Sequence, residues 1–193
     1  PDIVLFVNGL PLTVIECKSP TKTNPKEEGI KQLLRYSNNR TPADDEGAEK
    51  LFHFNQIMVS TSSDQAHVGT ITSKSNHYLE WKDPYPCDVA TLGDTPTAQE
   101  IMIQGLFTPT NFLDLIQNFV VFEPMDGKVI KKLARYQQFR AVHKTIERIK
   151  TGESRLEKGG VIWHTQGSGK SLTMVFLTIK IRRDPQLRDH KLV

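Results

Sequence analysis

Five residues, Gly167 to Ser171, have the types and spacing of a loop that binds a polyphosphate. The glycines at 167 and 169 let the backbone curve around a phosphate, and N–H groups at a helix start can bind its oxygens. A lysine supplies positive charge, and a serine hydroxyl suits a Mg²⁺ ion. The pattern predicts a nucleotide site formed by Gly167, Ser168, Gly169, Lys170 and Ser171, with Ser171 also a metal ligand.

The flanking residues predict the elements that position this loop. Residues 161–163 are apolar and favour a buried central strand, while residues 170–180 favour a helix. The strict P-loop pattern has a glycine where His164 stands, and Thr165 follows it. This T-x-G-x-G-K-S form resembles motif I of superfamily 2 helicases and translocases, a resemblance that implies ATP as the cofactor.

A second group of chemically useful residues lies at the front of the chain. Two apolar runs, 3–7 and 12–15, flank Asn8-Gly9 and predict a hairpin. The second run leads into Glu16 and Lys18, and Asp2 precedes the first. Two neighbouring carboxylates favour Mg²⁺ or Mn²⁺ between them, and a lysine can position water or stabilise phosphate charge. Asp2 and Glu16 are thus candidate metal ligands, with Lys18 as their catalytic partner.

The register of the hairpin decides whether these side chains meet. A two-residue turn at Asn8-Gly9 sets Asp2 opposite Ile15, on the face away from Glu16. A three-residue loop over 8–10 sets Asp2 opposite Glu16, because one step of slip moves every side chain to the other face. We predict the three-residue loop.

The spacing P-D-x13-E-x-K resembles the PD-(D/E)xK nuclease family. The following stretch, 25–36, has acidic residues in its first turn and an apolar side, which predicts a helix. Gln32 and Tyr36 share one face of that helix because they are four residues apart. This Q-x-x-x-Y spacing resembles the RecB-like branch of these nucleases and implies that both residues support the catalytic site.

The middle of the chain predicts a small mixed sheet with helices around it. Residues 41–49 are polar and predict a loop. Strands are predicted at Phe52–Ser60, His67–Thr72, Asn76–Lys82 and Phe119–Phe122, and helices at Gln99–Leu106 and Thr110–Asn118. Thr110 or Asn111 is expected to cap the second helix. We expect two domains, 1–125 and 126–193, with the nuclease residues in the first and the phosphate loop in the second.

The stretch 128–149 is basic and predicts a helix. Within it, residues 135–142 resemble the glutamine motif of superfamily 2 helicases, which implies a glutamine that reads the adenine edge. The spacing favours Gln138 as this residue, with Gln137 second and Tyr136 packing beside the base. A plain amphipathic helix is the alternative, and the phosphate loop about thirty residues later favours the nucleotide interpretation.

Composition excludes few classes of function. The chain has 193 residues, of which 37% are hydrophobic and 24% charged, as in ordinary globular proteins. No apolar run approaches the ~20 residues of a membrane span, so no membrane partner is expected. Two cysteines are too few for a disulfide framework, so we expect a cytoplasmic location. A net charge of +3 permits contact with nucleic acid without demanding it.

Together these segments resemble one family over nearly the whole chain. A RecB-like nuclease followed by a superfamily 2 motor resembles the restriction-and-motor (R) subunit of type I restriction endonucleases. The similar stretches are PDIVLFVNGLPLTVIECKSP, GLFTPTNFLDLIQNFVVFE, ARYQQFRAV and GGVIWHTQGSGKSLTM. The implied fold is α/β: a restriction-endonuclease-like mixed sheet with flanking helices, then a truncated RecA-like P-loop domain. The implied partners are double-stranded DNA and the methylation (M) and specificity (S) subunits.

The resemblance implies an ATP-dependent translocase that cleaves duplex DNA. We expect the chain to be part of a longer protein, with its final residues opening another strand. Without the carboxylate strand of a motor it should not turn over ATP. Many related nucleases also use an upstream acidic residue on a helix, and its counterpart here would lie before Pro1. Two alternatives stay open: a nucleotide- and DNA-binding motor module with a non-catalytic nuclease-like fold, and a defence or repair nuclease-helicase outside type I systems.

Overall fold

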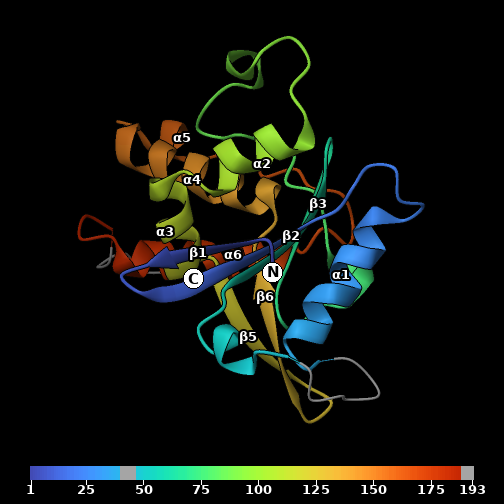
Figure 1. The fold of residues 1–193 in the computed structure, drawn as a ribbon. Coiled ribbons are helices and arrows are strands. Elements are labelled where there is room, and N and C mark those ends of the chain that lie inside the picture. Colours follow the sequence, from blue (N-terminus) through green and yellow to red (C-terminus); the bar gives the residue numbers. More distant parts are fainter. Residues whose placement is uncertain (40–46, 188–193) are drawn as a thin grey trace.

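A four-stranded mixed sheet lies at the centre of the molecule (Figure 1). The structure is a computed structural model, and it describes residues 1–39 and 47–187. The strand order is β1-β2-β3-β4, with β2 and β3 parallel and the outer pairs antiparallel. The strands are β1 (Ile3–Val7), β2 (Leu10–Cys17), β3 (Ile57–Ser62) and β4 (Gln65–Gly69). The expected α/β class with a mixed sheet is confirmed.

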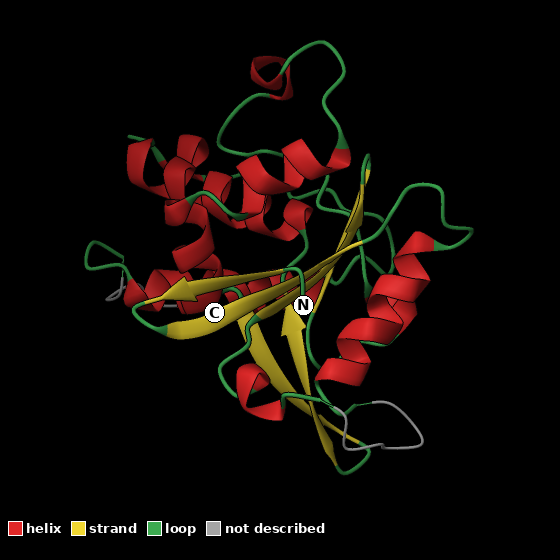
Figure 2. Ribbon diagram, viewed as in Figure 1, coloured by secondary structure: helices red, strands yellow, loops and turns green. Residues whose placement is uncertain are grey.

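Helices cover both faces of this sheet, as Figure 2 shows by colour. Helix α1 (Pro25–Tyr36), which has the predicted bounds, lies on one face and joins the parallel strands. The other helices are α2 (Ala98–Leu106), α3 (Pro109–Asn118), α4 (Tyr136–Thr151), the short α5 (Arg155–Lys158) and α6 (Lys170–Arg183). Short 3-10 turns span Glu49–Phe52, Ser75–His77 and Val89–Leu92. None of the described helices is long and apolar enough to cross a bilayer.

The two sheet faces bury separate apolar clusters, because side chains alternate along a strand. Val14 of β2 and Met58, its neighbour on β3, pack against α1 in the smaller cluster. Ile15 packs on the opposite face in the larger cluster, which also contains Phe139 of α4 and Phe176 of α6. One core therefore includes residues from both sides of the boundary expected near residue 125, and that boundary stays a prediction.

The three-residue loop predicted for the front hairpin is wrong. Asn8 and Gly9 both have positive φ and form a two-residue turn, which pairs Val7 with Leu10. The register nevertheless changes further along, because Leu12 is an extra, bulged residue in β2. Beyond this bulge Ile3 pairs with Ile15. Asp2 therefore lies opposite Glu16, the relationship predicted from a different turn.

The helix predicted over 128–149 is also partly wrong. Residues 128–133 form β6 (Lys128–Leu133), which pairs with β5 (Val120–Met125) in a two-stranded hairpin. Asp126 and Gly127 take φ values of 51° and 74°, the positive pair that an Asp-Gly hairpin turn requires. The β-branched pair Val129-Ile130 and the Asp-Gly signal outweigh the helix-favouring lysines. Helix α4 begins only at Tyr136.

Smaller differences concern the ends of elements. The strand predicted from Phe52 begins at Ile57, and the segment 76–82 joins the sheet only through a bridge between Val68 and Leu79. Helix α3 begins after Thr108, not after the expected caps Thr110 or Asn111, since Pro109 starts it readily. Most of the loop predicted over 41–49, and the strand expected to open near residue 190, lie outside the described residues.

Candidate active site and phosphate-binding loop

Glu16 and Lys18 lie at the end of β2, beside α1. Glu16 is 1% exposed, and Lys18 Nζ lies 2.6 Å from its Oε1. Asp2 directly precedes the neighbouring strand β1, and its Oδ2 accepts a hydrogen bond of 2.7 Å from the backbone N–H of Cys17. The structure thus brings the three predicted catalytic residues to one end of the hairpin.

The charges at this end of the sheet influence one another. Partial burial raises the pKa of the Cys17 thiol, and the negative charges of Asp2 and Glu16 raise it further. Glu16 Oε2 is buried and has no hydrogen-bond partner among the described residues. Within 1–39 and 47–187, no three His, Cys, Asp or Glu side chains gather as a metal cluster. The site therefore offers two carboxylates, one of which has a free buried oxygen.

Helix α1 extends this site through polar contacts. Lys18 Nζ donates a hydrogen bond of 2.5 Å to Gln32 Oε1, and Gln32 Nε2 donates to the Tyr36 hydroxyl. The Arg35 guanidinium lies 5.5 Å from the centre of the Tyr36 ring. The prediction that Gln32 and Tyr36 share a face is confirmed, and the contact between Gln32 and Lys18 orients the lysine.

Two small residues that the motifs did not single out allow α1 to lie this close. Ser60 of β3 is the neighbour of Glu16 in the parallel pair, and its hydroxyl donates to the Lys26 carbonyl at 3.0 Å. A Cβ on Gly29 would lie 2.2 Å from Ser60 Oγ. A glycine inside a predicted helix was the available signal, since such a glycine often marks close packing.

The glycine-rich loop over 167–171 curves as its two glycines predict. Gly167 and Gly169 take φ values of 77° and 81°, in the left-handed region that favours glycine, and α6 starts at Lys170. Lys170 Nζ donates to the carbonyls of His164 and Thr165, at 3.2 and 3.1 Å. The loop therefore curves around its own lysine.

The strand predicted before this loop does not form. Val161 and Trp163 are 88% and 89% exposed, and they pair with no strand among the described residues. A fully apolar run predicts a strand buried on both faces, but a strand also needs a hydrogen-bonded neighbour. Nothing in the described part of the chain supplies that neighbour.

The two candidate adenine readers lie in different surroundings. Gln138 is 2% exposed; its Oε1 accepts from Arg135 N at 2.8 Å, and its Nε2 donates to Gly169 O at 2.9 Å. A second carbonyl, that of Ser168, lies 3.4 Å from the same nitrogen. Gln138 thus joins the start of α4 to the phosphate loop. Gln137 Oε1, in contrast, is buried without a hydrogen-bond partner in the described structure.

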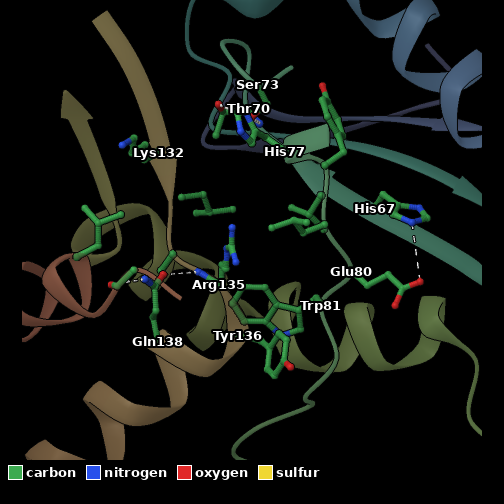
Figure 3. Close-up of a pocket in the computed structure, with 18 of the residues that line it drawn as sticks. His67, Thr70, Ser73, His77, Glu80, Trp81, Lys132, Arg135, Tyr136 and Gln138 are labelled. Atoms are coloured by element: carbon green, nitrogen blue, oxygen red, sulfur yellow. Dashed lines mark hydrogen bonds and ion pairs between the residues drawn. The ribbon is translucent and has the colours of Figure 1, made fainter. Parts of the chain in front are cut away.

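A cleft of about 820 Å³ opens beside the loop (Figure 3). Its walls come from β4 and the segment that follows it, from β6, from the start of α4 and from residues 167–169. Basic side chains around it are Lys26, Lys82, Lys131, Lys132 and Arg135. Glu80 is the one carboxylate among the described lining residues, and it lies 3.8 Å from His67. This excess of positive charge suits an anionic ligand.

Lys131 is a buried member of this wall that sequence reasoning missed. Its Nζ donates to the Asn55 carbonyl at 2.6 Å, and burial lowers its pKa to about 8. The Lys131 carbonyl accepts hydrogen bonds from the hydroxyls of Thr70 and Thr72. These contacts hold the β5–β6 hairpin against the central sheet.

Comparison with known families matches both ends of the chain. Residues 1–77 match the family described as "Type I restriction enzyme R protein N terminus", and residues 137–193 match "SWI2/SNF2 ATPase". The first match covers the front hairpin, α1 and the central strands. The second covers α4, the phosphate loop and α6. The class is therefore a restriction-type α/β protein followed by an ATPase-related segment.

Individual relatives are similar to this chain over nearly all of its length. The HindI endonuclease subunit of a type I restriction enzyme from Haemophilus influenzae is 34% identical over 196 residues, covering 100% of this chain and 18% of that relative. A putative MjaIXP endonuclease subunit from Methanocaldococcus jannaschii is 27% identical over 206 residues, covering 97% of this chain and 18% of the relative. The chain belongs to the family of type I restriction enzyme R proteins, and it spans about a fifth of these relatives' length.

Proposed function

We propose that this protein cleaves DNA as the endonuclease subunit of a type I restriction system, by Mg²⁺-dependent hydrolysis of a phosphodiester at Asp2, Glu16 and Lys18. The observation that carries this proposal is the position of the Lys18 ammonium. It lies between Glu16 Oε1, at 2.6 Å, and Gln32 Oε1, at 2.5 Å. A lysine held this way beside two carboxylates is arranged to act on a phosphate group.

The donor set fits a magnesium ion. Glu16 Oε2 lacks a hydrogen-bond partner in the described structure, and the Cys17 N–H holds the Asp2 carboxylate beside the end of β2. Magnesium usually keeps several waters and takes only one or two carboxylates, so two protein ligands are sufficient. When bound, the ion would polarise the scissile phosphate and lower the pKa of a bound water.

The protein side chains have separable roles in this proposal. Lys18 positions the attacking water or stabilises the charge that develops on the phosphate. Gln32 fixes the ammonium by accepting its hydrogen bond, and Tyr36 in turn holds the Gln32 amide. Because Glu16 and Gln32 both accept hydrogen bonds from Lys18, the ammonium is held at the end of the sheet.

The phosphate loop is proposed to belong to a RecA-like motor domain that begins near residue 126 and binds ATP. Residues 167–171 would hold the phosphates, with Lys170 neutralising charge and Ser171 binding Mg²⁺. The basic cleft beside the loop is large enough for the rest of a nucleotide. Gln137, with its unpartnered amide oxygen, is the better candidate to contact adenine, since Gln138 is already bonded to the loop.

The activity of the whole protein goes beyond these residues. Family membership supports coupling of DNA cleavage to ATP-driven translocation of double-stranded DNA. It also supports assembly with methylation (M) and specificity (S) subunits. The boundary near residue 125 would then separate the nuclease part from the motor part, even though one apolar cluster includes residues of both.

Nicking of supercoiled plasmid DNA tests the nuclease proposal. We expect Mg²⁺-dependent nicking by the purified protein and its loss in Lys18→Ala and Asp2→Ala. Lys22→Ala is the matched control, since Lys22 is an exposed lysine four residues further on that pairs only loosely with Glu28, at 3.6 Å. If both site variants nick like the parent, the nuclease fold serves only for binding. For the nucleotide site, Lys170→Ala should weaken the binding of ADP with Mg²⁺.

A further inference from the structure

One carboxylate joins three helices on the side of the sheet opposite α1. Asp114 of α3 accepts hydrogen bonds from Lys180 of α6 at both oxygens, at 2.6 and 2.5 Å. Its Oδ2 also lies 2.7 Å from His143 Nε2 of α4, and its Oδ1 accepts from Asn118 at 2.6 Å. Asp114, Asn118, His143 and Lys180 are called the Asp114 joint below. Sequence motifs did not predict this joint, because its three helices are far apart along the chain.

The surroundings of this joint make it rigid. The Lys180 ammonium lies 5.4 Å from the centre of the buried Phe119 ring, and His143 stacks on the same ring at 5.7 Å. Burial by itself would raise the pKa of Asp114, but hydrogen bonds from His143, Lys180 and Asn118 outweigh it and hold the pKa at about 2. Asp114 therefore stays charged and bonded across the physiological range.

Helix α6 connects this joint to the phosphate loop. The loop ends where α6 begins, and Lys180 lies ten residues along the helix, about 15 Å away at the rise of an α-helix. A second contact strengthens the same end: Arg183 donates to the Gln117 carbonyl and, at 3.0 Å, to Asn118 Oδ1. The C-terminal half of α6 is thus fastened to α3, and α3 packs on the core of the central sheet.

We propose that Asp114 is a positioning residue for the nucleotide site: it acts through Lys180 to hold α6, and with it the phosphate loop, against α3. The inference rests on the proposed binding of nucleotide at residues 167–171. A nucleotide that orders the loop then also stabilises α3, and α3 in turn supports nucleotide binding, because coupling between two sites is reciprocal.

A second ion pair on α6 provides a matched control. Lys150 of α4 lies 2.5 Å from Asp184, at the end of α6. This pair ties α6 to α4, as the Asp114 joint does, but it does not involve α3. Removing this pair shows whether the loss of any ion pair on α6 weakens nucleotide binding. If only the Asp114 contacts matter, removing it leaves the binding unchanged.

The experiment measures the affinity of the purified protein for ADP with Mg²⁺, well below the melting temperature of each variant. We expect Asp114→Asn to weaken binding about fivefold or more, the lower end of typical coupling between sites, and Lys150→Met to leave it unchanged. Lys180→Met serves as a second variant if Asp114→Asn does not fold. In hydrogen exchange, ADP should protect residues 109–118 in the parent and not in Asp114→Asn.

The outcomes separate the two proposals. If the parent protein binds ADP and Asp114→Asn binds it equally well with the same protection of α3, the positioning role is overturned. Equal losses in Asp114→Asn and Lys150→Met would also overturn it, because the effect would not depend on α3. If the parent protein itself does not bind ADP, the proposed nucleotide site fails, and this inference fails with it.

Discussion

Lys18 and Gln32 meet through their side chains although fourteen positions separate them: Lys18 Nζ donates to Gln32 Oε1 at 2.5 Å. The lysine directly follows β2, and the glutamine lies within α1. The contact ties the helix to the proposed catalytic group, and Tyr36 holds the other end of the glutamine amide. The orientation of Lys18 therefore depends on a residue that need not touch DNA.

The first prediction concerns this orienting amide. Gln32→Ala should lower the rate of Mg²⁺-dependent nicking about 10- to 100-fold, the usual cost of losing a residue that orients a site. Lys31→Ala is the matched control, because Lys31 is the exposed neighbour on the same helix. Plasmid nicking at saturating Mg²⁺ measures both. Equal rates for Gln32→Ala and the parent would contradict the orienting role.

The second prediction concerns the close approach of α1 to β3. Gly29→Ala should destabilise the fold by about 1–3 kcal/mol, the range for overpacked cores. The new Cβ would lie 2.2 Å from Ser60 Oγ but 3.1 Å from Ser60 Cβ. Adding Ser60→Ala should therefore recover part of the loss. Urea unfolding of the two single variants and the double variant measures the coupling.

Gly160→Ala is the control for this pair, because its new Cβ would meet no atom closer than 3.6 Å. It should leave the unfolding free energy nearly unchanged. Additive effects of Gly29→Ala and Ser60→Ala would show that the contact between these residues does not limit the packing of α1.

The third prediction separates the two neighbouring glutamines of α4. Gln137→Ala should weaken the binding of ADP more than that of GDP, because a free amide oxygen can contact the adenine edge. Gln138→Ala should weaken both nucleotides alike, since its amide holds the Gly169 carbonyl and so shapes the phosphate loop. Competition binding with the two diphosphates measures the ratio. A loss of base preference in Gln138→Ala alone would reverse the assignment.

The fourth prediction follows from the low pKa of Asp114. The folded value of about 2 lies below the ordinary 3.8, so the folded state favours the charged carboxylate. Its contribution to stability is present above pH 3.8 and is lost as the pH falls toward 2. Asp114→Asn should therefore cost on the order of 2 kcal/mol near pH 6, at roughly 1.4 kcal/mol per pKa unit. The cost should shrink in acid.

Urea unfolding of the parent and Asp114→Asn at pH 6, 4 and 3 checks this prediction. A difference between parent and Asp114→Asn that stays constant over this range would contradict the proposed ionisation of Asp114.

Predictions from the sequence succeeded where spacing along one element decides the geometry. The helix over 25–36 has the predicted bounds, and Gln32 and Tyr36 meet because four residues make about one turn. The predictions failed where another local signal, or a partner far away in the sequence, determines the secondary structure. The Asp-Gly turn at 126–127 made a hairpin of a basic stretch, and the apolar run at 161–163 pairs with no strand within 1–39 and 47–187.

By itself the sequence determined the types of residue at both ends of the chain and their local order: two carboxylates and a lysine on a hairpin, and a glycine-rich loop before a helix. Only the tertiary structure decided which of them meet. The bulge at Leu12 sets Asp2 opposite Glu16, the amide of Gln138 holds the phosphate loop, and Asp114 joins α6 to α3. Such contacts depend on how elements pack, and spacing along the chain does not specify packing between residues far apart.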